Sequence, residues 1–126
     1  MKFDEYIEVC MDNYYCIRIL QLKPAASSTD LEALMHMRVV EMERWIPGVQ
    51  QFSLLRTNTP ADEPTRYVMT LTFANFEAYA YWRQVEDEAP AYWPQLASVL
   101  LRCEQLCTLV EKYEGTMILQ EILSSD

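Results

Sequence analysis

The stretch Glu43–Arg56, ERWIPGVQQFSLLR, decides the fold of this sequence. Its first residues continue an apolar stripe at helical spacing, and Pro47-Gly48 ends that helix. Proline disfavours helical geometry in the residue before it, and glycine accepts the positive φ of a tight exit. The next segment, Val49–Thr57, has the composition of a strand. Because the connection is so short, the helix and the strand must pack against each other.

Similar patterns predict the other elements. Apolar residues at helical spacing predict helices over 3–11, 29–46 and 76–85, and a further one from Pro94 up to Gly115. Runs of β-branched and aromatic residues predict strands over Tyr14–Lys23, Val49–Thr57, Thr65–Phe73 and Thr116–Leu123. Thr29 and Glu32 have the spacing of a capping box, and Asn75 is placed to cap the next helix. Residues 86–90, EDEAP, are expected to form a loop.

The order of these elements predicts the fold class. Without the N-terminal helix and one added helix before the last strand, the order is βαββαβ, the ferredoxin-like α+β arrangement with an antiparallel sheet. A length of 126 residues and the lack of any linker-like segment predict a single domain over 1–126.

Alternation along the strands predicts the two faces of the sheet. The face toward the helices is expected to carry Ile17, Ile19, Phe52, Leu54, Met69, Leu71 and Phe73. The opposite face is expected to carry Cys16, Arg18, Leu20, Gln51, Ser53, Leu55, Val68, Thr70 and Thr72. That mixed face is too apolar to remain in water, so we expect a homodimer in which two sheets cover each other. A terminal helix folded over the sheet within one chain is the alternative.

The composition restricts the class of partner. Ten basic against nineteen acidic residues give a net charge of −9, which disfavours nucleic acid and anionic membranes. No apolar leader or membrane-spanning run is present, and the four cysteines lack metal or redox spacing, so we expect a cytoplasmic protein with buried thiols.

Few residues suggest metal or cofactor chemistry. Glu32 and His36 lie four residues apart on one helix face, but two ligands do not make a metal site. Cys103 and Cys107 have the same spacing within an apolar stripe, which favours core packing. With only two glycines, the chain has no phosphate-binding loop. We therefore predict no metal site and no cofactor.

Arg18 is the residue that most suggests a binding site. It lies in the middle of a strand, at the expected level of Gln51, Ser53 and Thr70. An enclosed arginine needs an anionic partner, and a small-molecule carboxylate or enolate is one candidate. An acidic residue of a partner subunit, or solvent at an edge strand, is the other. Aromatic residues including Trp82 could line the entrance to such a cavity.

The segments LQLKP, IPGVQQFSLL and YVMTLTFANFEAYAYW, spanning 14–82, resemble the dimeric α/β-barrel superfamily. That group includes the antibiotic-biosynthesis monooxygenases, the stress-responsive barrel proteins and the EthD-like proteins. The resemblance implies a dimeric barrel that binds a small apolar or aromatic ligand, with cofactor-independent monooxygenation or isomerisation as its chemistry; a non-catalytic interaction protein is the alternative. The cofactor-free and haem-degrading monooxygenases resemble one another in using an Asn and a Trp around the helix after the third strand. Asn75 and Trp82 fall in roughly that region of this sequence. The histidine that haem-degrading members carry there is absent, so haem binding is not expected. The long segment 86–114 would form a lid or an added interface.

Overall fold

The computed structural model describes residues 13–121 and 123 of the chain. The helix predicted over 3–11 lies outside the described residues. The elements are β1 (Tyr14–Leu22), α2 (Ser28–Trp45), β2 (Val49–Arg56), β3 (Arg66–Phe73), α3 (Phe76–Tyr92), α4 (Pro94–Leu106) and β4 (Cys107–Thr116).

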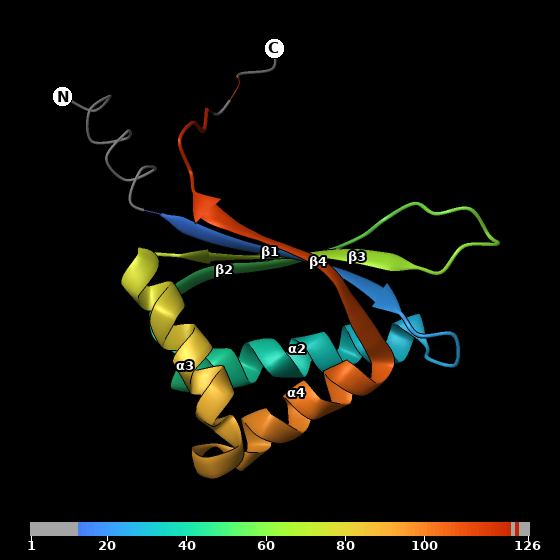
Figure 1. Cartoon of the computed structure of the whole chain (residues 1–126), viewed down its shortest axis with the longest axis horizontal. Coiled ribbons are helices and arrows are strands. Elements are labelled where there is room, and N and C mark those ends of the chain that lie inside the picture. Colours follow the sequence, from blue (N-terminus) through green and yellow to red (C-terminus); the bar gives the residue numbers. More distant parts are fainter. Residues whose placement is uncertain (1–12, 122, 124–126) are drawn as a thin grey trace.

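The strands form one antiparallel sheet in the order β2-β3-β1-β4, and the helices pack on one side of it (Figure 1). The β2–β3 hairpin places these two strands side by side. Helix α2 connects β1 to β2, and α3 with α4 connects β3 to β4 at the other edge of the sheet. The predicted ferredoxin-like α+β arrangement is confirmed. The sheet is open, with β2 and β4 at its edges. No described helix lies over its second face (Figure 1).

Helix α2 begins earlier than the predicted capping box. Ser27 is the N-cap, and its hydroxyl accepts a hydrogen bond of 3.3 Å from the backbone N–H of Asp30. Thr29 lies inside the helix, so the predicted Thr29–Glu32 box is wrong. The physical reason is that the Glu32 carboxylate accepts hydrogen bonds from Arg56 and Tyr67 instead. Asn75, by contrast, caps α3 as predicted, accepting from the N–H of Ala78 at 2.9 Å.

The helix exit at Pro47-Gly48 has the predicted geometry. Gly48 has φ 92°, and its carbonyl accepts a hydrogen bond of 3.1 Å from the N–H of Ala74 at the end of β3. A Cβ at position 48 would lie 2.7 Å from the Cβ of Ala78 in α3. The glycine therefore provides both the positive φ and the space that lets α3 approach the start of β2.

The C-terminal half differs from its prediction. The expected loop over 86–90 is helical, because α3 continues to Tyr92 with Pro90 in its last turn. Helix α4 ends at Leu106, and Cys107 begins β4, which pairs with β1 over the whole length of β1. The predicted continuation of the helix to Gly115 and the predicted strand Thr116–Leu123 are therefore wrong. Pairing with β1 decides the conformation of this segment, since it satisfies backbone groups that a longer helix would leave at the sheet edge.

The two faces of β1 are the reverse of the prediction. Arg18 lies opposite Met69 and Ile17 opposite Thr70, and paired residues of neighbouring strands share a face. Cys16, Arg18 and Leu20 therefore point toward the helices, whereas Ile17 and Ile19 lie on the uncovered face. The assignments for β2 and β3 agree with the structure: Phe52 and Leu54 pack against the core, and Met69, Leu71 and Phe73 are buried.

The core lies between this sheet face and the helices. Its largest fully buried side chains are Trp82, Tyr67, Phe73, Leu31, Leu34, Met69, Leu71, Leu96 and Val85. Burial of each large apolar side chain contributes about 1.5–3 kcal/mol before entropy is subtracted. The same layer also contains a buried arginine, Arg38, and the cavity around it forms the candidate site. None of the described helices is both long and apolar enough to cross a membrane.

Candidate functional site

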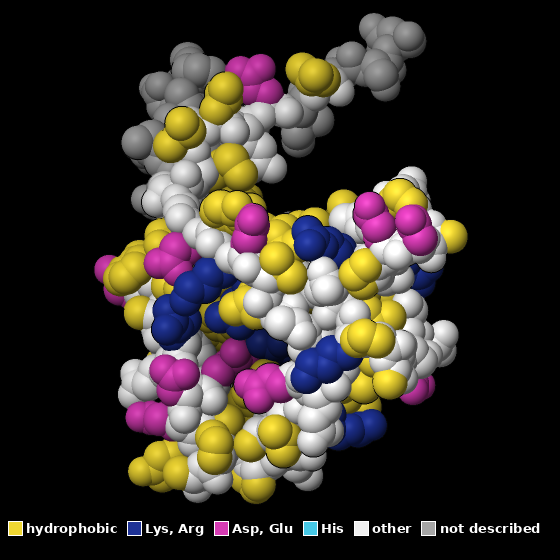
Figure 2. Space-filling model, turned by 45° about the vertical axis from the view of Figure 1, so that its right-hand side comes forward, with side chains coloured by type: hydrophobic (Ala, Val, Ile, Leu, Met, Phe, Trp, Pro, Cys, Tyr) yellow, Lys and Arg dark blue, Asp and Glu magenta, His cyan; other side chains and the backbone are white. Residues whose placement is uncertain are grey.

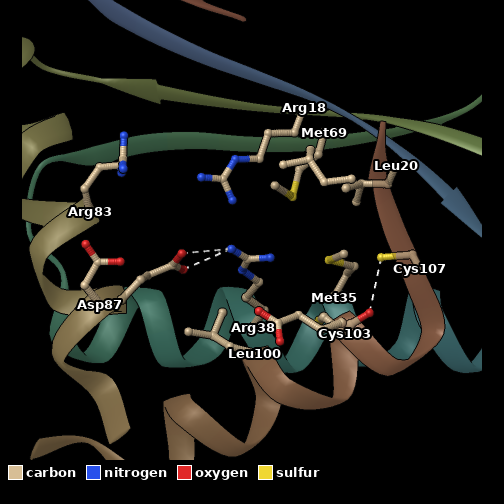
Figure 3. Close-up of a pocket in the computed structure, with 13 residues that line it drawn as sticks. Arg18, Leu20, Met35, Arg38, Met69, Arg83, Asp87, Leu100, Cys103 and Cys107 are labelled. Atoms are coloured by element: carbon tan, nitrogen blue, oxygen red, sulfur yellow. Dashed lines mark hydrogen bonds and ion pairs between the residues drawn. The ribbon is translucent and has the colours of Figure 1, made fainter. Parts of the chain in front are cut away.

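A cavity of about 290 Å³ lies between the sheet and the helices (Figure 3). Its lining comes from every layer of the fold: Arg18, Leu20 and Met69 from the sheet, Met35 and Arg38 from α2, Arg83, Glu86 and Asp87 from α3, Leu100, Cys103 and Glu104 from α4, and Cys107 and Leu109 from β4. This volume is near the lower end of small-molecule pockets, which hold about 300–1,000 Å³. Part of the lining carries charged groups and part is apolar.

Arg18 extends from the middle of β1 into this cavity (Figure 3). Its guanidinium carbon lies 4.9 Å from the ring centroid of Trp82, a cation–π contact with a fully buried indole. The Nε atom of Arg18 is buried and has no hydrogen-bond partner, and within residues 13–121 no carboxylate forms an ion pair with this side chain. The Nε1 atom of Trp82 is likewise buried and unpartnered. Two neighbouring N–H donors therefore lack acceptors, and the Nε atom of Arg38 in the same cavity is a third.

Arg38 has the counter-ion that Arg18 lacks. Its Nη2 lies 3.1 Å and 3.0 Å from the two carboxylate oxygens of Glu86, and the side chains are 7% and 12% exposed. Burial alone would lower the pKa of Arg38, but the charge and hydrogen bonds of Glu86, together with the nearby Cys103 and Cys107, raise it. This ion pair joins α2 to α3 across the floor of the cavity. Its charges cancel, so it contributes no free cation to a ligand.

The sulfur-containing side chains of Met35, Met69, Cys103 and Cys107 form an apolar part of the lining (Figure 3), with Glu104 of α4 also in the lining. The Cys107 thiol donates to the carbonyl of Cys103 at 3.2 Å. Burial raises the pKa of Cys107 to about 11 and also raises that of Cys103. Both thiols are therefore protonated at neutral pH, which leaves them uncharged and makes them poor nucleophiles and metal ligands.

The mouth of the cavity carries a chain of polar contacts. Arg83 of α3 donates to the hydroxyl of Tyr79 at 3.1 Å. The Tyr79 hydroxyl donates to Glu114 of β4, which also accepts from Tyr14 at 3.2 Å. Burial and the Glu114 carboxylate both raise the pKa of Tyr79, so its hydroxyl keeps its proton. Figure 2 shows basic and acidic side chains gathered across the middle of one face of the molecule.

Solved structures share this architecture. The cofactor-independent oxygenase SnoaB from Streptomyces nogalater is 17% identical, with 90% of this chain and 99% of that chain covered and a TM-score of 0.61. A putative antibiotic biosynthesis monooxygenase from Chloroflexus aurantiacus is 16% identical over 89% and 99% of the two chains, with a TM-score of 0.53. A dimeric ferredoxin-like protein from an uncultured marine organism is 17% identical over 87% and 99%, with a TM-score of 0.57.

The chain shares the ferredoxin-like fold of these structures. The resemblance inferred from the sequence is thus confirmed for the fold, and identities this low support nothing more. No family model matches the chain, and no curated protein matches it in sequence.

The fold brings together only part of the predicted site. Arg18 and Trp82, which were predicted to belong to the same site, are in contact. Gln51, Ser53 and Thr70 lie on the uncovered face, so Arg18 is near the level of the Ser53–Thr70 pair, but the expectation that it shares their face is wrong. The physical reason is the reversed orientation of β1: its register with β3 places Arg18 beside Met69, under the helices.

Arg38, Arg83 and Glu86 line the cavity but were not predicted from the sequence. A signal existed for Arg38, because it follows Leu34 by four residues and precedes Met42 by four, within the apolar stripe of α2. A charged residue in such a stripe requires a buried partner. Arg83 and Glu86 gave no comparable signal, since Glu86 lies in a segment expected to be a loop.

The Glu32–His36 pair does not form a metal site with other described side chains. Glu32 accepts hydrogen bonds from Arg56 Nε at 2.9 Å and from the Tyr67 hydroxyl at 2.8 Å. These hydrogen bonds lower the pKa of Glu32. Over residues 13–121, no group of three histidine, cysteine or carboxylate side chains is placed to hold a metal ion.

Proposed function

We propose that this chain binds a small organic anion in the cavity between sheet and helices, with Arg18 as the anchor. The observation that carries the proposal is that Arg18, whose Nε is buried and unpartnered, has no ion pair with a described carboxylate, whereas Arg38 in the same cavity is paired with Glu86. A buried N–H donor without an acceptor is costly, and a bound carboxylate, enolate or phenolate would supply that acceptor. The unpartnered indole N–H of Trp82 lies beside it as a second donor.

The chemistry we propose at this site is cofactor-independent oxygenation or isomerisation of the bound anion. A fixed guanidinium stabilises negative charge that develops on an enolate or phenolate oxygen, which favours removal of a proton from the ligand. The uncharged wall around Met35, Met69 and Cys107 provides room for an apolar or aromatic body. The fold likeness to SnoaB, a cofactor-independent oxygenase, supports oxygenation as the reaction class.

The proposal includes a homodimer formed through the uncovered face of the sheet. Leu55 and Tyr113 on that face are 61% and 57% exposed, and Ile17 and Ile19 lie between them. A large apolar sheet face is rarely left in water, and a second copy would cover it. The dimeric state of the marine ferredoxin-like neighbour supports this assembly. Light scattering at micromolar concentration should give twice the mass of one chain; a monomer would contradict the assembly.

The test of anion binding compares two arginine variants. Melting of the wild-type protein is followed against a series of aromatic carboxylates and enolisable ketones. Arg18→Met should remove the ligand-dependent increase in Tm, since loss of a charged hydrogen bond weakens binding by at least about tenfold. Arg102→Met removes the same charge from the exposed side of α4 and should keep the increase. Equal increases in both variants would refute Arg18 as the anchor.

Oxygen consumption with each ligand that binds then tests the chemistry. Turnover that depends on Arg18 and needs no added metal or cofactor would support the proposed oxygenation. Conversion of the ligand without oxygen uptake would support isomerisation. Tight binding with no conversion of any ligand would favour the non-catalytic alternative.

A further inference from the structure

Arg83 is a second guanidinium in the cavity without a carboxylate partner. It extends from α3 toward the same space as Arg18, which comes from the opposite side (Figure 3). Among the described residues, no carboxylate lies within ion-pair distance of Arg83. Its contacts are the hydrogen bond to the Tyr79 hydroxyl and a distance of 6.0 Å from its guanidinium carbon to the Tyr79 ring centroid. Unlike Arg18, Arg83 is exposed, and therefore stands at the mouth.

Tyr79 holds one edge of the Arg83 guanidinium in place. The Tyr79 side chain is almost completely buried, and its hydroxyl is fixed because it donates to Glu114. The same hydroxyl oxygen then accepts from Nη1 of Arg83. A guanidinium has five N–H donors, so this contact leaves other donors available to a ligand. Glu114 acts through two tyrosine hydroxyls, Tyr79 and Tyr14, and does not neutralise Arg83 by a direct ion pair.

The charges of the lining indicate what the ligand carries. The cavity is lined by three arginines and three carboxylates, and of these Arg38 and Glu86 form an ion pair, whereas Asp87 and Glu104 form none with the other two arginines. Arg18 in the interior and Arg83 at the mouth remain. A ligand with one acidic group can contact one of them well, whereas a ligand with two acidic groups can contact both.

We propose that the cavity takes a small organic dianion, with one acidic group at Arg18 and the other at Arg83, and that Tyr79 positions Arg83 for it. This rests on the proposed function of Arg18 as the anion anchor. Two other carboxylates, Asp87 and Glu104, line the cavity without an ion pair to either arginine. Asp87 lies one helical turn after Arg83, and therefore opposes the second acidic group.

The experiment is calorimetric titration with benzoate and isophthalate at one low salt concentration. The two compounds share the aromatic ring and differ by one carboxylate. Wild-type protein should bind isophthalate about fivefold more tightly than benzoate, because an exposed ion pair at the mouth contributes at most about that factor. Arg83→Met should bring the ratio of the two affinities close to one while benzoate binding is kept. Tyr79→Phe should reduce the ratio, and Asp87→Asn should increase it.

Each outcome has a distinct meaning. If benzoate binds through Arg18 but isophthalate has no advantage, or if Arg83→Met keeps the wild-type ratio, the dianion inference is wrong and the anion site remains. If neither compound nor any other carboxylate binds the wild-type protein, the proposed function itself fails. Arg102→Met is the charge-matched control and should leave both affinities unchanged. Because Arg83 is exposed, the Arg83→Met variant should fold even if Tyr79→Phe does not.

Discussion

Glu86→Leu should strongly destabilise the fold. This change leaves the Arg38 guanidinium, only 7% exposed, without its counter-ion. Removing one partner of a buried ion pair costs about 3–5 kcal/mol. With an unfolding entropy of roughly 2.1 cal/mol/K per residue, the lower value corresponds to a decrease in Tm of about 11 °C for a chain of 126 residues. Urea unfolding followed by circular dichroism measures the free energy directly.

The double variant Arg38→Met, Glu86→Leu separates the ion pair from packing. Two apolar side chains of similar volume should recover most of the loss, because neither charge then remains buried. The double-mutant cycle should therefore give a coupling of about 2 kcal/mol or more. Additive effects of the two changes, or a Glu86→Leu protein within about 1 kcal/mol of wild type, would refute the reasoning. Such a result would mean that water reaches Arg38 through the cavity.

Three further changes test the fold. Gly48→Ala should destabilise by about 2 kcal/mol or more, from positive-φ strain and the approach of Ala78 Cβ to 2.7 Å; unaltered urea unfolding would contradict this account of the helix exit. Ser27→Ala should cost about 1 kcal/mol as the true N-cap, whereas Thr29→Ala should stay within about 0.5 kcal/mol; the opposite order would restore the capping box. The lowered pKa of Glu32 means that its contribution is complete above its ordinary value of 4.5 and is lost as the pH falls through the lowered pKa. Glu32→Gln should thus flatten the dependence of Tm on pH in that acidic range, and an unchanged slope would count against the interaction.

The exit of α2, the cap of α3 and the faces of β2 and β3 were predictable from the sequence because their signals are local. Pro47-Gly48 ends α2, Asn75 caps α3, and the alternation of Phe52, Leu54 and Met69 identifies the buried face of β2 and β3. Each signal depends on a residue's own backbone preference or on strand periodicity, and the tertiary contacts of these residues favour the same conformation.

The C-terminal half was not predictable in the same way. Cys103, Cys107 and Val110 continue the spacing of an apolar helix stripe, yet Cys107 starts a strand because β1 offers a complete set of pairing partners. Pro90 suggested a break, but it lies in the last turn of α3, where its missing N–H costs one backbone hydrogen bond and does not end the helix before Tyr92. Long-range pairing decided where β4 begins, and local patterns do not contain it.

The candidate site was predictable only through Arg18. The strand β1 carries apolar residues on both faces, Cys16 and Leu20 on one and Ile17 and Ile19 on the other, so alternation could not orient it. The arginine itself suggested the wrong face, since a charged residue is expected away from the helices. In the structure the helix layer accommodates Arg18 because Trp82 stacks on it and a cavity lies beside it.

The most direct test of anion binding at Arg18 is the ¹⁵N NMR spectrum of the arginine Nε–Hε groups during titration with benzoate. The Nε group of Arg18 is buried and lacks an acceptor, so its signal should be visible and should shift saturably as the carboxylate arrives. The signal that disappears from the spectrum of the Arg18→Met variant is assigned to Arg18, and the signal of exposed Arg102 is the reference for a non-binding arginine. A saturable shift at Arg18 with no change at Arg102 is the predicted result. If the carboxylate binds and the Arg18 signal does not move, the anchor lies elsewhere and the account of this cavity is wrong.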